Sequence, residues 1–198
     1  MNLIIIAGMP ASGKSTVSAK ISEHFGYPII EKDDIKEELF DTIGFNCYAK
    51  KRRLDVASTA VLLRVLDSLL KGGVSHIIIN NFRSNASNEV KAIIDKHNAK
   101  VVTVFLGGDA DIFYQRYIER DRIGARHIGH AVQEHYPPRH GDPTTHEMSR
   151  EEFAEKFEKL GMDNFNIGGK RIEVDATYPQ EIDTDTLIKE IEAAFNEN

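Results

Sequence analysis

Residues 8–15 read Gly-Met-Pro-Ala-Ser-Gly-Lys-Ser and match the pattern G-x-x-x-x-G-K-[ST]. The apolar run 3–7 stands directly before this stretch, and the segment 14–25, with apolar residues at four-residue spacing, follows it. A strand, a glycine-rich turn and a helix in this order bring backbone N–H groups together, and the helix N-terminus adds positive potential. The pattern therefore predicts a phosphate-binding turn between a buried strand and a helix, and it indicates a nucleoside triphosphate as the ligand.

The residues of this turn, the phosphate loop (residues 8–16), have distinct predicted roles. We expect Lys14 to reach the β- and γ-phosphates of ATP, Ser15 to coordinate Mg²⁺ and Thr16 to lie near the α-phosphate. The predicted nucleotide-binding residues are Gly8, Met9, Pro10, Ala11, Ser12, Gly13, Lys14, Ser15 and Thr16.

Short apolar runs alternate with segments of helical periodicity along the rest of the chain. We predict strands at 3–7, 28–30, 76–79, 101–106 and 171–174, and helices at 14–25, 34–40, 54–70, 89–97, 111–120, 151–160 and 186–195. This alternation predicts an α/β fold with a parallel sheet and helices on both faces. The stretch 123–149 has no sustained period, so it is either a functional lid or a disordered insertion in one domain of 198 residues.

Charge and cysteine content argue against several classes of protein. The chain holds 25 Lys and Arg against 31 Asp and Glu, a net charge of −6, which argues against a globally basic nucleic-acid binder. Cys47 is the one cysteine, so no internal disulfide and no oxidising compartment are required. The run 3–7 is too short for a signal sequence or a membrane span, and we expect a cytoplasmic location and no membrane partner.

Other motifs narrow the class of nucleotide-binding protein. The chain lacks the N-K-x-D sequence that a GTPase uses for guanine. A ring-forming motor would carry an acidic pair after its next core strand, whereas the strand predicted at 76–79 ends in Asn80 and Asn81. Small-molecule kinases remain, in which arginines of a lid close over the phosphates.

Three sequence segments resemble one family of phosphate-loop kinases. They are residues 8–16, the stretch Lys-Asp-Asp-Ile-Lys at 32–36, and Arg116-x-x-x-Arg120 followed by Arg-His-Ile-Gly-His at 126–130. The family includes polynucleotide 5′-kinase, zeta-toxin-type kinases and chloramphenicol phosphotransferase, and many members are known only as AAA-like ATP-binding proteins. The resemblance implies a three-layer αβα fold of the nucleoside-kinase-like P-loop NTPase type, with a five-stranded parallel sheet. It also implies ATP at the carboxyl ends of the strands and an acceptor hydroxyl opposite.

The resemblance implies that Asp33 is the catalytic base and that Lys36 stands where the family has an arginine. The sequence supports this assignment in part, since Asp34 and Glu37 fit a capping box that would occupy the Asp34 carboxylate and leave Asp33 free to face the cleft. A carboxylate beside an acceptor hydroxyl can take its proton during phosphoryl transfer. The alternative is that both aspartates only stabilise the start of a helix.

Arginines concentrate in a predicted lid at about 116–140, where five arginines stand against three acidic residues. Arg116 and Arg120 lie four residues apart and so share one helix face. Guanidinium groups suit the charge that develops on the γ-phosphoryl group, and we predict Arg120 and Arg126 as the catalytic pair. The alternative is an exposed helix in which these arginines pair with Glu119 or Asp121.

The acceptor pocket is expected beside the third strand, at the carboxyl edge of the sheet. The candidate acceptor-binding residues are Asp34, Lys36, Asn81, Arg83 and Arg116. Because no acid follows that strand, Ser15 and water, with Asp33 or Asp34, would have to hold Mg²⁺. The stretch 175–179, after the last strand, is expected near the adenine or on the surface. The basic run 50–53 is interpreted as the solvated start of a helix or as a contact for an anionic acceptor.

These observations lead to two hypotheses of function. The first is an ATP-dependent kinase that uses Mg²⁺ and transfers the γ-phosphoryl group to a hydroxyl of a small molecule, nucleoside or nucleotide. The second is an ATP-binding regulatory switch that hydrolyses ATP slowly and acts through a protein partner. A polynucleotide bound by its end stays open as the acceptor, whereas the net charge argues against a long nucleic-acid track.

Overall fold

Five parallel strands form one sheet in the part of the chain that the computed structural model describes, namely residues 1–82, 84–141, 148–159 and 166–197. The strands lie in the order β2-β3-β1-β4-β5. They are β1 (Asn2–Gly8), β2 (Ile29–Glu31), β3 (His76–Ile79), β4 (Lys100–Gly107) and β5 (Lys170–Asp175). The predicted five-stranded parallel sheet is confirmed, and its carboxyl ends share one edge.

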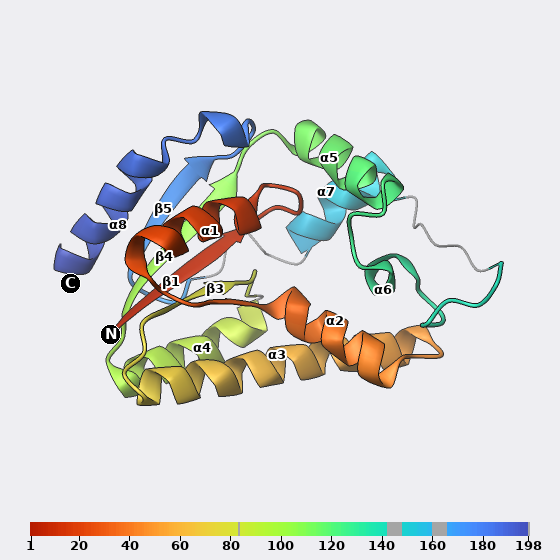
Figure 1. Cartoon of the computed structure of the whole chain (residues 1–198), viewed down its shortest axis with the longest axis horizontal. Coiled ribbons are helices and arrows are strands. Elements are labelled where there is room, and N and C mark those ends of the chain that lie inside the picture. The colour runs from red at the N-terminus through yellow and green to blue at the C-terminus, as the bar shows by residue number, and fades with distance from the viewer. Residues whose placement is uncertain (83, 142–147, 160–165, 198) are drawn as a thin grey trace.

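The sheet has a separate apolar core on each face because successive strand residues point to opposite sides. Ile4 and Ile6 of β1 belong to one core, with helices α1 (Lys14–Phe25) and α8 (Thr184–Glu197). Leu3 and Ile5 belong to the other, with α3 (Tyr48–Lys71) and α4 (Ser84–His97). Figure 1 shows these two helical layers on either side of the strands, which confirms the predicted three-layer αβα architecture.

Helix α2 (Lys32–Ile43) begins directly after β2, with no intervening loop. The prediction that this helix starts at Asp34, capped by the Asp34 side chain, is wrong. Glu31 occupies the N-cap position without a side-chain cap, and Asp33 and Asp34 lie in the first turn. The abrupt transition therefore places three acidic residues, Glu31, Asp33 and Asp34, within four positions close to the carboxyl edge of the sheet.

Helix α3 begins at Tyr48, upstream of the predicted start at Leu54. The apolar periodicity starts only at Leu54, but the basic run 50–53 is helical as well. Lys51 is buried, with 8% of its surface exposed, and donates to the carbonyl oxygens of His130 (2.9 Å) and Val132 (2.5 Å). For Lys51, the interpretation of this run as a solvated helix start is wrong, since its ammonium ties α3 to the chain around α6 (Ile128–Ala131).

Replacing Lys51 with methionine is expected to lower the free energy of unfolding by about 2–4 kcal/mol, because two carbonyl groups then lose a charged donor. Equilibrium urea denaturation measures this change. The control is Arg53→Met on the same helix, where the side chain is exposed and the change in stability should be about 0.5 kcal/mol or less. Equal stability of the Lys51→Met variant and the unmodified chain would contradict this role.

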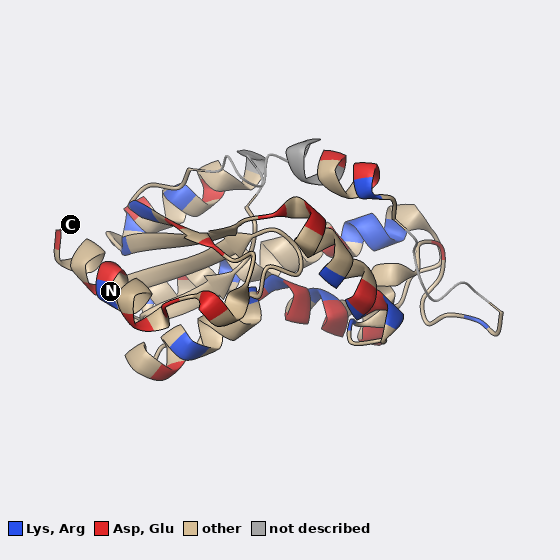
Figure 2. Ribbon diagram, turned by 90° about the horizontal axis from the view of Figure 1, so that it is seen from above, with Lys and Arg blue, Asp and Glu red and all other residues tan. Residues whose placement is uncertain are grey.

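The remaining described helices lie near the carboxyl edge of the sheet (Figure 1). They are α5 (Ala110–Arg122), α7 (Arg150–Lys159) and the short 3₁₀ helix η1 (Pro179–Glu181). The predicted helix 151–160 corresponds to α7, although position 160 lies outside the described residues. Lys and Arg are interspersed with Asp and Glu along the helices (Figure 2). None of the described helices is both long and apolar enough to cross a lipid bilayer.

Candidate active site

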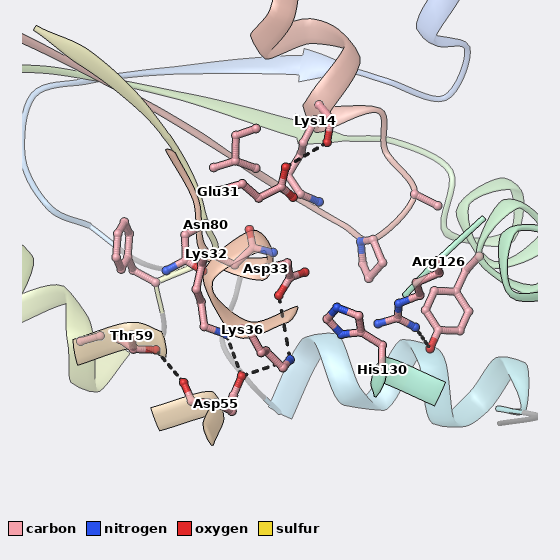
Figure 3. A pocket seen from close by; sticks show the side chains of 18 of the residues that line it. Lys14, Glu31, Lys32, Asp33, Lys36, Asp55, Thr59, Asn80, Arg126 and His130 are labelled. Atoms are coloured by element: carbon pink, nitrogen blue, oxygen red, sulfur yellow. Dashed lines mark hydrogen bonds and ion pairs between the residues drawn. The ribbon is translucent and has the colours of Figure 1, made fainter. Parts of the chain in front are cut away.

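A cavity of about 890 Å³ opens at the carboxyl edge of the sheet. The phosphate loop and the end of β2 form one side, α2 and α3 the second, and α5 with the chain around α6 the third (Figure 3). The cavity collects most of the predicted site residues from distant parts of the sequence. Its lining includes Pro10, Ala11, Gly13, Lys14, Ser15, Thr16, Asp33, Lys36, Asn81, Arg116, Arg120 and Arg126.

Two glycines determine the path of the phosphate loop. Gly8 has a φ of +143°, and a Cβ atom there would lie 2.3 Å from the carbonyl oxygen of Leu106. Gly13 has a φ of +86° and forms the N-cap of α1, where its carbonyl accepts from the amides of Thr16 and Val17. The first amides of α1 have no helical acceptor, so this loop fits a bound phosphate group.

Lys14 holds its ammonium within the phosphate loop. Its Nζ atom donates to the carbonyl oxygens of Gly8 (3.1 Å) and Met9 (2.8 Å). Burial lowers the pKa of Lys14 to about 8, although the carboxylates of Asp33 and Glu31 act in the opposite direction. Because the ammonium is poorly solvated there, it would interact strongly with an anion that enters the loop.

Glu31 is a site residue that the sequence analysis missed. Its Oε2 atom accepts a hydrogen bond of 3.2 Å from the hydroxyl of Ser15, the predicted Mg²⁺ ligand. Burial raises the pKa of Glu31, and the nearby carboxylates of Asp33 and Asp34 raise it further. A hydroxyl and a carboxylate that line the cavity together with Lys14 fit Mg²⁺, which takes one or two protein oxygens together with phosphate oxygens and water.

The described residues contain no group of three or more His, Cys, Asp or Glu side chains that would hold a metal ion by protein ligands alone. A magnesium site shared with a nucleotide does not require such a group. The signal that could have identified Glu31 is its place as the last residue of a short strand, at the edge where Ser15 also lies.

Replacing Glu31 with glutamine is expected to raise the Mg²⁺ concentration needed for half-maximal nucleotide binding by about 10-fold or more, because the site loses a charged oxygen ligand or orienting group. Titration of Mg²⁺ against a fluorescent ATP analogue measures the change. Glu38→Gln on the exposed face of α2 removes the same charge outside the cavity and should leave the titration unchanged. An unchanged titration of the Glu31→Gln variant would rule out the role in metal binding.

Asn81 contacts the phosphate loop directly. Its Oδ1 atom accepts from the Gly8 amide (2.7 Å), and its Nδ2 atom donates to the Gly8 carbonyl (2.8 Å). At the end of β1, the Asn81 side chain thus makes the hydrogen bonds that the backbone of a neighbouring strand would otherwise make. Asn81 also lines the cavity, so its predicted contact with an acceptor stays a prediction. Arg83, the neighbouring candidate, lies outside the described residues.

Asp33 and Asp34 have different surroundings although both are in the first turn of α2. Both are exposed, Asp33 with half of its side chain accessible, but Asp33 lines the cavity and Asp34 does not. Burial opposes ionisation of Asp33, but Lys36, Lys32 and Arg126, together with His130 when it is protonated, outweigh it, so the pKa of Asp33 lies below its ordinary value. A carboxylate that is ionised at neutral pH can accept a proton from a hydroxyl.

Arg120 and Arg126 both line the cavity next to Tyr117. Arg126 donates to the Tyr117 hydroxyl (2.9 Å) and pairs with the buried carboxylate of Asp121 (3.5 Å). The Nε atom of Arg120 is buried without a hydrogen-bond partner among the described residues. Burial lowers the pKa of Arg120, and the neighbouring Arg126 lowers it further. Two neighbouring guanidinium groups, of which Arg120 has this unpaired donor, suit a phosphate group with several oxygens.

Arg116 has a different position from the other two arginines. It donates to the carbonyl oxygens of Ala176 (3.3 Å) and Thr177 (2.5 Å), in the loop after β5. The same loop approaches the phosphate loop, since Pro179 lies 3.5 Å from where a Cβ atom of residue 13 would be. Arg116 therefore connects α5 to the stretch 175–179 that the sequence analysis expected near the adenine, and its predicted acceptor contact stays a prediction.

The chain around α6 is docked onto α2 in this structure. His130 is buried and its Nε2 atom lies 2.8 Å from Glu37, while His127 lies 3.1 Å from Asp41. Phe40, Phe45, Leu54 and Val132 form a small apolar core beneath these contacts. The predicted lid thus contacts α2 and α3 at one side of the cavity, and Arg126 precedes this docked segment.

Comparison with known proteins gives one family and several similar folds. A family model described as an AAA domain (AAA_33) matches residues 3–136. None of the curated proteins matches the sequence. A protein from Chloroflexus aurantiacus J-10-fl, described as a presumed kinase, has a TM-score of 0.80 at 24% identity, with 98% of this chain and 97% of that chain covered.

Two further solved structures share the fold at lower similarity. A sugar kinase from Janibacter sp. HTCC2649 has a TM-score of 0.59 at 13% identity, over 99% of this chain and 95% of that one. A gluconokinase from Sinorhizobium meliloti 1021 has a TM-score of 0.56 at 16% identity, over 99% and 92%. At these identities the similarity establishes the fold, which is that of phosphate-loop proteins with a three-layer αβα architecture.

Proposed function

The chain belongs to the AAA domain family, and we propose that it is an ATP-dependent kinase that transfers the γ-phosphoryl group to a hydroxyl of a small molecule, nucleoside or nucleotide. The observation that carries the proposal is the shared cavity, in which Lys14 of the phosphate loop and Asp33 of α2 lie with Arg120 and Arg126. Lysine and arginine would bind the transferred group while the carboxylate stands on the acceptor side. The kinases among the similar folds support the same reaction class.

In the proposed reaction an acceptor hydroxyl oxygen forms a bond to the γ-phosphorus while the bond from that phosphorus to the β–γ bridging oxygen breaks. The hydroxyl proton passes to the Asp33 carboxylate, and ADP leaves. Lys14, Arg120 and Arg126 would stabilise the charge on the transferred group. Ser15 and Glu31 would hold Mg²⁺, which supplies further neutralisation of the phosphate oxygens when bound.

The whole chain, residues 1–198, is proposed to act as one kinase domain with the segment at about 116–140 as its lid. We further propose that it acts in the cytoplasm, where ATP is abundant and where the single free Cys47 is compatible with a reducing environment. Lys and Arg are interspersed with Asp and Glu along the described ribbon (Figure 2), which argues against a long polyanion as the acceptor.

Incubation of the chain with γ-labelled ATP, Mg²⁺ and a panel of hydroxyl compounds tests the proposal. We expect label to move to at least one acceptor, with ADP formed in equal amount. Labelled inorganic phosphate as the sole product, together with partner binding that depends on ATP, would instead favour the regulatory switch. One argument for the regulatory switch was that no acidic residue follows β3. That argument is weaker because the Glu31 carboxylate lies beside Ser15.

A further inference from the structure

The end of the cavity between α2 and α3 contains a group of charged side chains that the proposed reaction does not use. Lys32 and Lys36 approach the same oxygen of Asp55, with Nζ to Oδ1 distances of 2.7 and 3.2 Å. Arg52 approaches the other oxygen at 3.2 Å. Lys32, Lys36 and Asp55 are each only 15% exposed, and Arg52 is 43% exposed. All four residues, termed here the Asp55 group, line the cavity.

The Asp55 group has more positive than negative charge. Three cations share the Asp55 carboxylate, and Lys36 also lies 3.9 Å from Asp33, so three positive charges face two negative ones. Burial lowers the pKa of Lys36 despite the nearby Asp33 and Asp55. Burial opposes ionisation of Asp55 as well, but Lys32 and Lys36 outweigh it, so the pKa of Asp55 lies below its ordinary value. Partly buried cations are costly unless they are paired, and the Asp55 carboxylate is shared among all three while Asp33 lies near Lys36 alone.

The Asp55 group lies next to Asp33, where the proposed acceptor would bind. Figure 3 shows Asp33 between Lys14 on one side and Lys36 with Asp55 on the other. A molecule whose hydroxyl meets Asp33 would therefore extend from the phosphate side of the cavity toward the Asp55 group. A neutral polyol would find the Asp55 oxygens occupied by cations, whereas an anion would meet ammonium and guanidinium donors with remaining N–H bonds.

We propose that the acceptor carries an anionic group, a carboxylate or a phosphate, in addition to the hydroxyl that is phosphorylated, and that Arg52, Lys36 and Lys32 bind this group. The inference rests on the proposed function. Asp55 holds the three cations in place, so that the site exists before the acceptor arrives. Arg52 is the most exposed of the three and offers the planar donor pair that suits both anions.

Matched pairs of compounds test this inference. Each pair differs by one anionic group: glycerate and glycerol, gluconate and sorbitol, and nucleoside 3′-monophosphates and the corresponding nucleosides. Transfer of label from γ-labelled ATP gives kcat/KM, and calorimetry in the presence of a non-hydrolysable ATP analogue and Mg²⁺ gives binding. We expect the anionic member of at least one pair to be preferred by about 10-fold or more, from hydrogen bonds to a charged group. The carboxylate and phosphate pairs distinguish the two anions.

A comparison of Arg52→Gln with the matched control Arg53→Gln shows whether the preference for anionic compounds comes from the cavity. Arg53 is the next residue on the same helix, is exposed and does not line the cavity. We expect Arg52→Gln to raise KM for the anionic acceptor by about 10-fold, with little change for ATP, and Arg53→Gln to leave both unchanged.

The outcomes separate this inference from the proposed function. Binding of an anionic compound that depends on Arg52, without transfer to any compound, would support the anion site and contradict the kinase. Transfer to neutral members as efficient as to anionic ones would support the kinase and overturn the anion site. Failure of every anionic member both to bind and to accept label would overturn the inference as well.

Discussion

Asp33→Asn is expected to lower kcat for phosphoryl transfer by about 10²–10⁴-fold while leaving ATP affinity within about twofold. Asparagine keeps the shape of the side chain but cannot take the hydroxyl proton. Asp33 lines the cavity, and Lys36 at 3.9 Å helps to keep its carboxylate ionised. Steady-state kinetics with the accepted hydroxyl compound and equilibrium binding of an ATP analogue measure the two quantities.

Asp34→Asn provides the comparison for this experiment, because it removes the same charge from the next residue of α2. Asp34 is exposed and outside the cavity, so its variant should retain turnover within about twofold. Wild-type turnover of the Asp33→Asn variant would show that Asp33 is not the base. Loss in the Asp34→Asn variant alone would transfer that role to Asp34.

The pH dependence of the reaction provides a second check on Asp33. Its pKa is held below the ordinary value by Lys36, His130, Lys32 and Arg126, which outweigh the effect of burial. The proton-accepting form therefore persists to lower pH than it would for a free aspartate, whose pKa is about 4. We expect the acid limb of kcat/KM to show no Asp33 titration above about pH 4, provided that the protein stays folded.

The sequence predicted those parts of the site that depend on residues close together in the chain. Gly8, Gly13 and Lys14 belong to one continuous motif, and the strand before it and the helix after it follow from local periodicity. The sheet order also agrees with a parallel α/β fold. Local patterns succeed here because the phosphate loop takes its shape from backbone conformation at its own glycines.

The contacts that join distant residues could not be predicted in the same way. Asn81 pairs with Gly8, and Lys32 pairs with Asp55, across separations in sequence that leave no periodic signal. The start of α3 was misplaced because Lys51 is polar, and only the fold shows that His130 and Val132 provide its acceptors. The start of α2 was misplaced because Asp34 and Glu37 fit a capping pattern, whereas β2 continues directly into the helix at Lys32.

Lys14→Ala is expected to lower kcat/KM for ATP by about 10³-fold or more, since the transferred group loses a positive charge that is preorganised in the loop. The ammonium now donates to the carbonyls of Gly8 and Met9, and a nucleotide would exchange these acceptors for phosphate oxygens. Direct binding of a fluorescent ATP analogue and label transfer together show whether the loss falls on affinity, on turnover or on both.

The stability of the Lys14→Ala variant distinguishes a lost function from a lost fold. Burial lowers the pKa of Lys14 in the folded chain to about 8, so the charged form of this lysine opposes folding at pH values below about 8. Replacement by alanine removes this penalty together with the hydrogen bonds to the Gly8 and Met9 carbonyls. Because the two effects oppose each other, we expect little change in the melting temperature at neutral pH, even as nucleotide binding is lost. A lower melting temperature with intact binding would contradict both the predicted role of Lys14 and the electrostatic account of the phosphate loop.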